Sequence, residues 1–170
     1  MARSSVASTP RHAGSKAAVA AAIIGALLSL GYAAWAFTAR RGIFQDFADG
    51  TLVTADDAKS SDTLDTVFLL AAGVVAVIGL LWLTKELLSR AVGKWVPKFA
   101  GLMVGVLGSV AVVMGLSLAS NVPDPGSQAE QGDRGVTATV IVGGGFVLVA
   151  VGLLVGSLGI RSQDSRLHSA

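Results

Sequence analysis

The polar side chains that could do chemistry in this chain are few, and their spacing favours structural roles. Asp56, Asp57 and Asp62 lie close together in the sequence and could bind a divalent cation through their carboxylates. Asp56 and Asp57 also follow Thr54, and a hydroxyl followed by acids is typical of the first turn of a helix, where acids complement the positive end of the helix dipole. We therefore favour a helix that begins at about Ala55 over a metal site.

The hydroxyl groups inside the apolar parts of the chain are the other candidates for reactivity, and none has an acid or a base near it in the sequence. They belong to Ser29, Tyr32, Ser109, Ser117 and Ser157. A serine in a membrane helix usually donates to a carbonyl of its own helix. Both histidines stand near the ends of the chain, and there is no cysteine for thiol or metal chemistry. We predict a protein that is not an enzyme, has no metal or cofactor of its own and binds no nucleic acid.

Four long apolar stretches dominate the sequence, and none of them contains a charged residue. Hydrophobic residues make up 52% of the chain and charged residues 14%, below the roughly 25% of a soluble domain. A helix needs about 20 apolar residues to cross a bilayer core of about 30 Å. The stretches are Ala17–Phe37, Thr66–Thr84, Phe99–Ser120 and Val136–Ile160. The sequence therefore predicts an all-α integral membrane protein with four transmembrane helices.

The distribution of basic residues predicts the orientation of these spans. Nine of the 13 Lys and Arg residues fall in the two ends of the chain and between the second and third spans, and four fall on the other side. Because cytoplasmic segments carry the excess of Lys and Arg, we expect both termini in the cytoplasm of a multi-pass plasma-membrane protein. The predicted organisation is a cytoplasmic tail at 1–16, the membrane domain at 17–160 and a second tail at 161–170. The first span is longer than the apolar core of a signal peptide, so we interpret it as a retained helix.

The first outer segment, Thr38–Asp65, has an internal pattern. Two phenylalanines at helical spacing stand beside acids, which predicts a short amphipathic turn lying on the outer membrane surface. Gly50 is expected to end this turn, and an outer helix then leads into the second span. The residues expected to form contacts at this surface are Phe44, Phe47, Thr54, Asp56 and Asp57.

Two further features concern the ends and the continuity of the later spans. Asn121–Gly135 is rich in Pro and Gly and has no apolar period, which predicts a flexible outer loop. Pro97 fits the first turn of the third span. Gly143–Gly145 could break the fourth helix, as in transporters, but no paired break and no nearby polar side chain accompany it. We therefore favour a continuous fourth helix.

Small residues recur at four-residue spacing in the spans and predict close helix packing. Such stripes let helix backbones approach one another where lipid removes the hydrophobic drive for association. The proposed packing residues are Gly25, Ser29, Gly101, Gly105, Gly115, Gly145, Gly152 and Gly156. We favour packing within the chain, and the third and fourth spans carry enough small residues to leave some for a partner or a second copy.

A basic face is expected on the cytoplasmic side, formed by Arg90, Lys94 and Lys98. Lys and Arg near the membrane attract anionic lipid headgroups, and this is our preferred interpretation. The alternative is a docking site for an acidic partner. We also expect lipid bound to the spans.

The region from the first span through the second resembles small actinobacterial four-span membrane proteins of uncharacterised function. The resemblance covers about residues 20–90. It rests on the segment A-R-R-G-I-F-Q-D-F-A-D-G-T-L-V-T-A-D-D-A-K-S-S-D-T-L-D and on a second span that ends in L-L-W-L-T-K. In those proteins a loop of the form G-x-(V/L)-(S/T)-x-x-(D/E)-A joins the first two spans. By type, a small multi-span chain without charges in its spans is also similar to accessory subunits of the respiratory supercomplex that joins cytochrome bcc to an aa-type oxidase.

Three functional hypotheses follow from these patterns. The first is a non-catalytic accessory, assembly or stability subunit that contacts other integral membrane subunits of a larger plasma-membrane complex, such as the respiratory electron-transport supercomplex. The second is a small homo-oligomeric channel or carrier, and the third is a membrane sensor or recruitment protein that acts through its basic face. We favour the first, because the spans offer packing surfaces and no reactive group.

Overall fold

The computed structural model describes residues 11–51, 55–88, 95–120 and 127–167, and these residues contain helices and no strand. The elements are α1 (Arg11–Trp35), the π-helical turn η1 (Ala36–Arg40), α2 (Arg41–Ala48), α3 (Ala55–Leu88), α4 (Trp95–Ser120) and α5 (Gln128–Leu167). Within this part of the chain, four helical segments are long and apolar enough to cross a membrane: Lys16–Ala48, Ser60–Leu88, Trp95–Ser120 and Gln128–Ile160. The predicted all-α four-span membrane protein is thereby confirmed.

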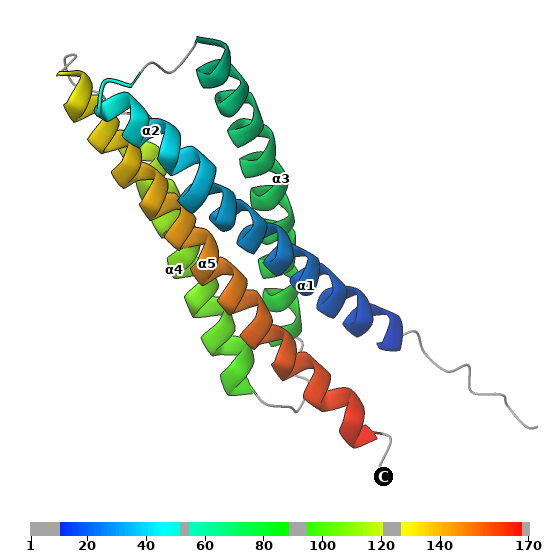
Figure 1. Cartoon of the computed structure of the whole chain (residues 1–170). Coiled ribbons are helices and arrows are strands. Elements are labelled where there is room, and N and C mark those ends of the chain that lie inside the picture. Colours follow the sequence, from blue (N-terminus) through cyan, green and yellow to red (C-terminus); the bar gives the residue numbers. More distant parts are fainter. Residues whose placement is uncertain (1–10, 52–54, 89–94, 121–126, 168–170) are drawn as a thin grey trace, which may run out of the picture.

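The four spans alternate in direction along the bundle (Figure 1). α1 and α4 run one way and α3 and α5 run the other way, so the start of α1 and the end of α5 lie at the same end of the bundle. We call that end the inner end. The opposite end, which holds α2 and the start of α3 and of α5, is the outer end. This alternation agrees with the arrangement expected for four successive spans.

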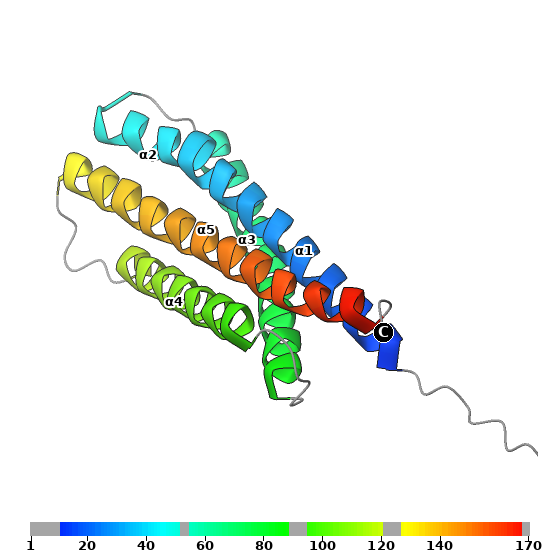
Figure 2. The ribbon, with the colours of Figure 1, turned by 90° about the horizontal axis from the view of Figure 1, so that it is seen from below.

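α5 is the central helix of the bundle. It makes its most extensive contact with α4 and its next most extensive with α1, while α3 packs mainly on α1 and makes little contact with α4 or α5. Viewed from below, α5 lies between α4 and α1 (Figure 2). The largest side chains buried along α5 are Phe146, Val149, Leu153 and Ile160. α5 is the most buried of the four spans, and α3 and α4 are the least buried.

The first long helix differs from our prediction at its outer end. We expected the span to end near Phe37 and a separate amphipathic turn to lie on the membrane surface. Instead the helix continues without a break through η1 and α2 to Ala48, and α2 packs along the start of α5. Gly50 then adopts a φ of 72° and ends the helical segment, as its sequence position predicted.

The start of α5 also differs from the prediction, because a capping box replaces the expected loop. The Glu130 amide donates to the Ser127 hydroxyl at 3.3 Å, and the Ser127 amide donates to the Glu130 carboxylate at 3.1 Å. These reciprocal bonds satisfy backbone donors at a helix start. The prediction of a flexible loop is therefore wrong from Gln128 onward. The start of α3 at Ala55, in contrast, confirms the predicted outer helix, and Pro97 lies in the first turn of α4 as expected.

α5 is continuous from Gln128 to Leu167. The alternative of a helix broken at Gly143–Gly145 is therefore wrong. The helix also extends past Ile160 into the segment that we assigned to a cytoplasmic tail, and α1 likewise begins at Arg11 rather than near residue 17. The two long helices thus extend beyond their apolar stretches at both ends.

Candidate functional site: a polar cluster at the outer end

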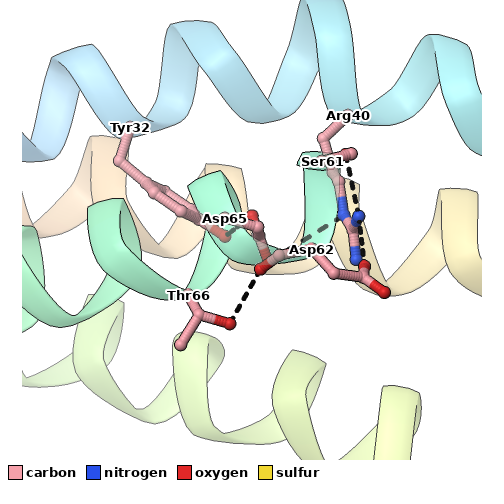
Figure 3. A network of polar contacts seen from close by, with 6 residues as sticks. All are labelled: Tyr32, Arg40, Ser61, Asp62, Asp65 and Thr66. Carbon is pink, nitrogen blue, oxygen red and sulfur yellow. Dashed lines mark hydrogen bonds and ion pairs between the residues drawn. The ribbon is translucent and has the colours of Figure 1, made fainter. Parts of the chain in front are cut away.

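A cluster of polar and charged side chains joins the first long helix to α3 at the outer end (Figure 3). Its members are Tyr32 from α1, Arg40 from η1, and Ser61, Asp62 and Asp65 from α3. We call these five residues the outer polar cluster. In this cluster, ionisable groups from the first long helix and from α3 meet beside the apolar spans.

Asp65 lies between the two donors of the first helix. The Tyr32 hydroxyl donates to Asp65 Oδ1 at 3.0 Å, and Arg40 Nε lies 3.9 Å from Asp65 Oδ2. Arg40 Nη1 makes the shorter contacts, at 2.7 Å from Asp62 Oδ1 and 3.0 Å from the Ser61 hydroxyl oxygen. One guanidinium therefore faces two carboxylates on successive turns of α3, and the charges compensate one another.

The π-helical turn places Arg40 in this position. α1 ends at Trp35, and η1 then covers Ala36–Arg40 before the α-helix resumes. A single π-helical turn inside an α-helix is rare and often occurs at functional sites. Inside this turn the Thr38 hydroxyl donates to the Ala34 carbonyl at 2.7 Å, which satisfies an acceptor where the regular ladder is interrupted.

Arg40 also connects the cluster to α5 through an aromatic ring. Its guanidinium carbon lies 4.7 Å from the centroid of the Phe44 ring, which is the geometry of a cation–π contact. The Phe44 ring in turn packs against the backbone of Gly135 at the start of α5, where a Cβ atom would collide with it. α3, the first helix and α5 are thus joined at the outer end through Arg40.

The inner side of the cluster is apolar and closely packed. Tyr32 is only 3% exposed, and its ring lies edge-on to Phe68 with centroids 5.9 Å apart and tilted against Phe146 with centroids 4.6 Å apart. Ser61 is also buried, and Arg40 and Asp65 are largely shielded. A hydrogen bond in such surroundings is costly to break, because removing one partner leaves the other without compensation.

This arrangement can hold two helices in one register. The bond from the Tyr32 hydroxyl fixes the position of Asp65 along α1. The contacts of Arg40 Nη1 fix Ser61 and Asp62 one helical turn nearer the outer end. Asp62 is 68% exposed at its side chain, so its ion pair contributes less than the shielded contacts do. The Thr66 hydroxyl donates to the Asp62 carbonyl at 2.8 Å, within α3 itself. The geometry therefore supports a structural link between helices.

The predicted packing glycines of α4 and α5 face one another inside the chain. A Cβ atom on Gly101 would lie 2.5 Å from the Gly152 carbonyl oxygen and 2.5 Å from the Gly156 amide nitrogen. A Cβ atom on Gly152 would lie 2.5 Å from the amide nitrogen of Gly105. The two backbones touch along this face, so these glycines lie in the interior of the bundle rather than on its surface.

The remaining packing residues make internal contacts of the same kind. Gly145 approaches the backbone of Gly108, with a Cβ position 2.7 Å from its carbonyl oxygen, and Gly115 approaches Val142. Gly25 lies against Leu153 and the backbone of Val75.

Ser29 lies at 0% exposure, and its hydroxyl has no hydrogen-bond partner among the described residues. The expected bond of a serine to its own helix is therefore absent there, whereas Ser109 donates to the Gly105 carbonyl at 3.0 Å and Ser157 to the Leu154 carbonyl at 2.8 Å.

The predicted outer-surface residues do not form one surface in the structure. Phe44 is half-buried between Arg40 and α5, and the Phe47 carbonyl accepts a hydrogen bond from Gln128 Nε2 at 3.0 Å. Both belong to a helix–helix contact instead of a turn on the membrane. Thr54 and the side chains of Asp56 and Asp57 lie outside the described residues. Asp62, the third aspartate of the cation alternative, pairs with Arg40, and no group of three or more His, Cys, Asp or Glu side chains in the described ranges could hold a metal ion.

The predicted basic face is described only at Lys98, since Arg90 and Lys94 lie outside the described residues. Lys98 is 2% exposed in the first turn of α4, so its side chain is buried against the bundle instead of facing outward. Lys85 at the end of α3 is exposed, and its ammonium nitrogen lies 4.7 Å from the centroid of the Trp82 ring. Trp95 stacks on Phe99 nearby in the chain, with centroids 5.0 Å apart. Tryptophan side chains of this kind are common where membrane helices meet the interface with water.

Sequence reasoning missed the outer polar cluster. We counted Arg40, Asp62 and Asp65 as charges of an outer loop and found no acid near the Tyr32 hydroxyl. The partner of that hydroxyl is 33 residues away in the sequence. A weaker signal was present, because Ser61 and Asp65 lie four residues apart and therefore on one face of a helix that begins at Ala55.

Comparisons of the chain with protein-family models, with curated proteins and with solved structures gave no match.

Proposed function

We propose that this protein is a non-catalytic accessory subunit of a larger plasma-membrane complex, where it assists assembly or stability by packing against other integral membrane subunits. One observation carries the proposal. α3 from Leu64 to Leu88 and α4 from Trp95 to Leu118 carry many exposed large apolar side chains, and these two spans are the least buried of the four.

The exposure of α3 and α4 follows from the way the bundle is built. α5 takes up the small-residue face of α4, and α1 takes up one face of α3, but α3 and α4 make little contact with each other. Their outward side chains include Leu70, Val74 and Leu81 on α3, and Leu107, Val113 and Met114 on α4, each more than half exposed. In a bilayer such faces contact lipid tails or the spans of another protein, and van der Waals packing decides between the two.

The composition of the α4 face supports protein contact. Met103 and Met114 are exposed on it among valines and leucines. Methionine side chains are flexible and polarizable, so they adapt to the irregular surface of a partner.

The polar cluster supports a structural role as well. Tyr32, Arg40 and Asp65 are bonded to one another across two helices. Ionisable side chains near membrane depth usually mark transport pathways or partner contacts. Here they join helices of the same chain, which suits a structural role.

The respiratory supercomplex of cytochrome bcc and an aa-type oxidase is the assembly that we propose to examine first. This choice rests on the similarity of type described above.

The proposal is tested by purifying the tagged protein at native expression. We expect extraction in a mild detergent to yield an assembly much larger than the 17.1 kDa chain, with defined integral membrane subunits identified by mass spectrometry. Recovery of the protein as a monomer under conditions that keep known membrane complexes intact would contradict the proposal. Recovery with a complex other than the respiratory one would retain the subunit role and reject that assignment.

A further inference from the structure

The inner and central parts of α3 are anchored by close contacts with three helices. Leu80 lies against Gly105 of α4, and Leu83 lies against Gly156 of α5. Leu83 is 1% exposed, and Gly79 approaches both Leu153 of α5 and the backbone of Ala21 in α1. Such interlocking of large side chains with glycines is stiff, because a change of even one methylene group is felt in a packed core. This part of α3 therefore moves only with the bundle.

The outer part of α3 is attached in a different way. In the segment 60–67, the large apolar side chains Leu64 and Val67 are both well exposed. The side chains that contact α1 and η1 from this segment include Ser61, Asp62 and Asp65, all polar. Apolar packing against the first helix begins only at Phe68, whose ring approaches Gly31 and Tyr32. We call residues 60–67 the α3 arm.

The arm is reached by a long side chain rather than by close backbone packing. η1 and α3 make little backbone contact, and Arg40 spans the distance between them with its guanidinium (Figure 3). The ion pair to the exposed Asp62 is weak because solvent screens it. The arm is therefore held by a small set of polar contacts, of which the ion pair to Asp62 is the most exposed to solvent.

We propose that the outer polar cluster acts as a latch, in which Arg40 holds the α3 arm against α1. When these contacts are broken, the arm moves while the remainder of α3 stays packed. Release uncovers Asp65 and the Tyr32 hydroxyl at the outer end. The latch is coupled to α5, because Arg40 also lies over Phe44 and Phe44 packs on Gly135. Loss of the π-helical turn would rotate Arg40 by about 100° about the helix axis and break the latch. This inference stands independently of the subunit role.

The chain has no cysteine, so pairs of introduced cysteines can be spin-labelled. Double electron–electron resonance then measures the distance between the α3 arm and α5. The outer pair is Leu64→Cys with Val140→Cys, and the reference pair is Val77→Cys with Val151→Cys. All four positions are exposed, and both pairs join α3 to α5. The measurement uses the full chain in lipid nanodiscs.

We expect a narrow distance distribution for both pairs in the otherwise unchanged protein. Arg40→Gln should raise the long-distance population of the outer pair about two-fold or more, which is the change expected from loss of a weak ion pair. The reference pair should not change. Arg41→Gln is the matched control, because Arg41 is the next residue, is exposed and belongs to the same helix. It should leave both distributions unchanged.

Either of two results would overturn the latch. One is an outer-pair distribution that Arg40→Gln and Asp65→Asn both leave unchanged. The other is a broadening of the outer and reference pairs together, which would show loosening of the whole bundle. Tyr32→Phe provides a milder variant that keeps the aromatic packing, and its effect on the outer pair should be smaller than that of Arg40→Gln.

Discussion

The Tyr32 hydroxyl stands at the point where an apolar core meets the polar end of the bundle. The ring is packed between Phe68 and Phe146, and only its oxygen reaches Asp65. Phenylalanine would preserve these ring contacts and remove one hydrogen bond. We therefore expect Tyr32→Phe to lower the free energy of unfolding by about 1 kcal/mol, the usual contribution of an interhelical hydrogen bond of this kind.

A serine of the same bundle gives the control for this residue. Ser109 donates to the Gly105 carbonyl of its own helix, so Ser109→Ala removes a hydroxyl without separating two helices. Denaturant titration of the purified variants in one detergent compares the two losses. Equal losses of unfolding free energy for Tyr32→Phe and Ser109→Ala would show that the bond to Asp65 adds no stability to the contact between α1 and α3.

Single residues also mark the limit of sequence reasoning at this scale. Periodicity shows that Ser61 and Asp65 share a helix face, but their partners depend on the register between two helices. The pairing of Tyr32 with Asp65 and the burial of Lys98 are properties of that register. Neither could be predicted from the sequence, because the residues that meet between two helices are far apart along the chain.

At the scale of elements, the contact between α4 and α5 depends on the absence of side chains. A Cβ atom on Gly101 would meet backbone atoms of Gly152 and Gly156, which cannot rotate away. We expect Gly101→Ala to force the helices apart and to cost about 1–3 kcal/mol or more of the free energy of unfolding.

Gly144 is the matched control for that substitution, because it lies in α5 and a Cβ atom there would have no atom within 4 Å. Alanine favours the helix over glycine by about 1 kcal/mol, so Gly144→Ala should be neutral or stabilising. Thermal unfolding in detergent measures both variants. A Gly101→Ala protein as stable as Gly144→Ala would contradict the close approach of α4 and α5.

Several elements could be predicted from sequence because their signals are local. The apolar stretches, the start of α3 at Ala55 and the break at Gly50 depend on composition, capping and turn residues. The early start of α5 was predictable too, because Ser127 and Glu130 form the S-x-x-E pattern of a capping box. Its glycines were misread as loop residues, although Gly132 and Gly135 allow α2 to approach α5. The π-helical turn has no sequence signal that we recognise.

The whole molecule is an unequal bundle, with a buried α5 and two spans that expose their apolar faces. Small-residue stripes could be predicted from the sequence, but the helix that each stripe contacts could not, because the third and fourth spans carry small residues on more than one face. The structure places those stripes in the interior. The partner surface that we propose therefore consists of the larger apolar side chains of α3 and α4.

Site-specific photo-crosslinking in native membranes tests the subunit role most directly. A photoreactive phenylalanine derivative is introduced at Leu70 of α3, at Leu107 of α4 or at Leu27 of α1, which have exposures of 61%, 63% and 64%. The α3 and α4 positions should give adducts with defined integral membrane proteins. The α1 position should give mainly lipid adducts, because more of that span is already covered within the bundle. Lipid adducts alone at all three positions would contradict the proposal that this protein packs against a larger complex.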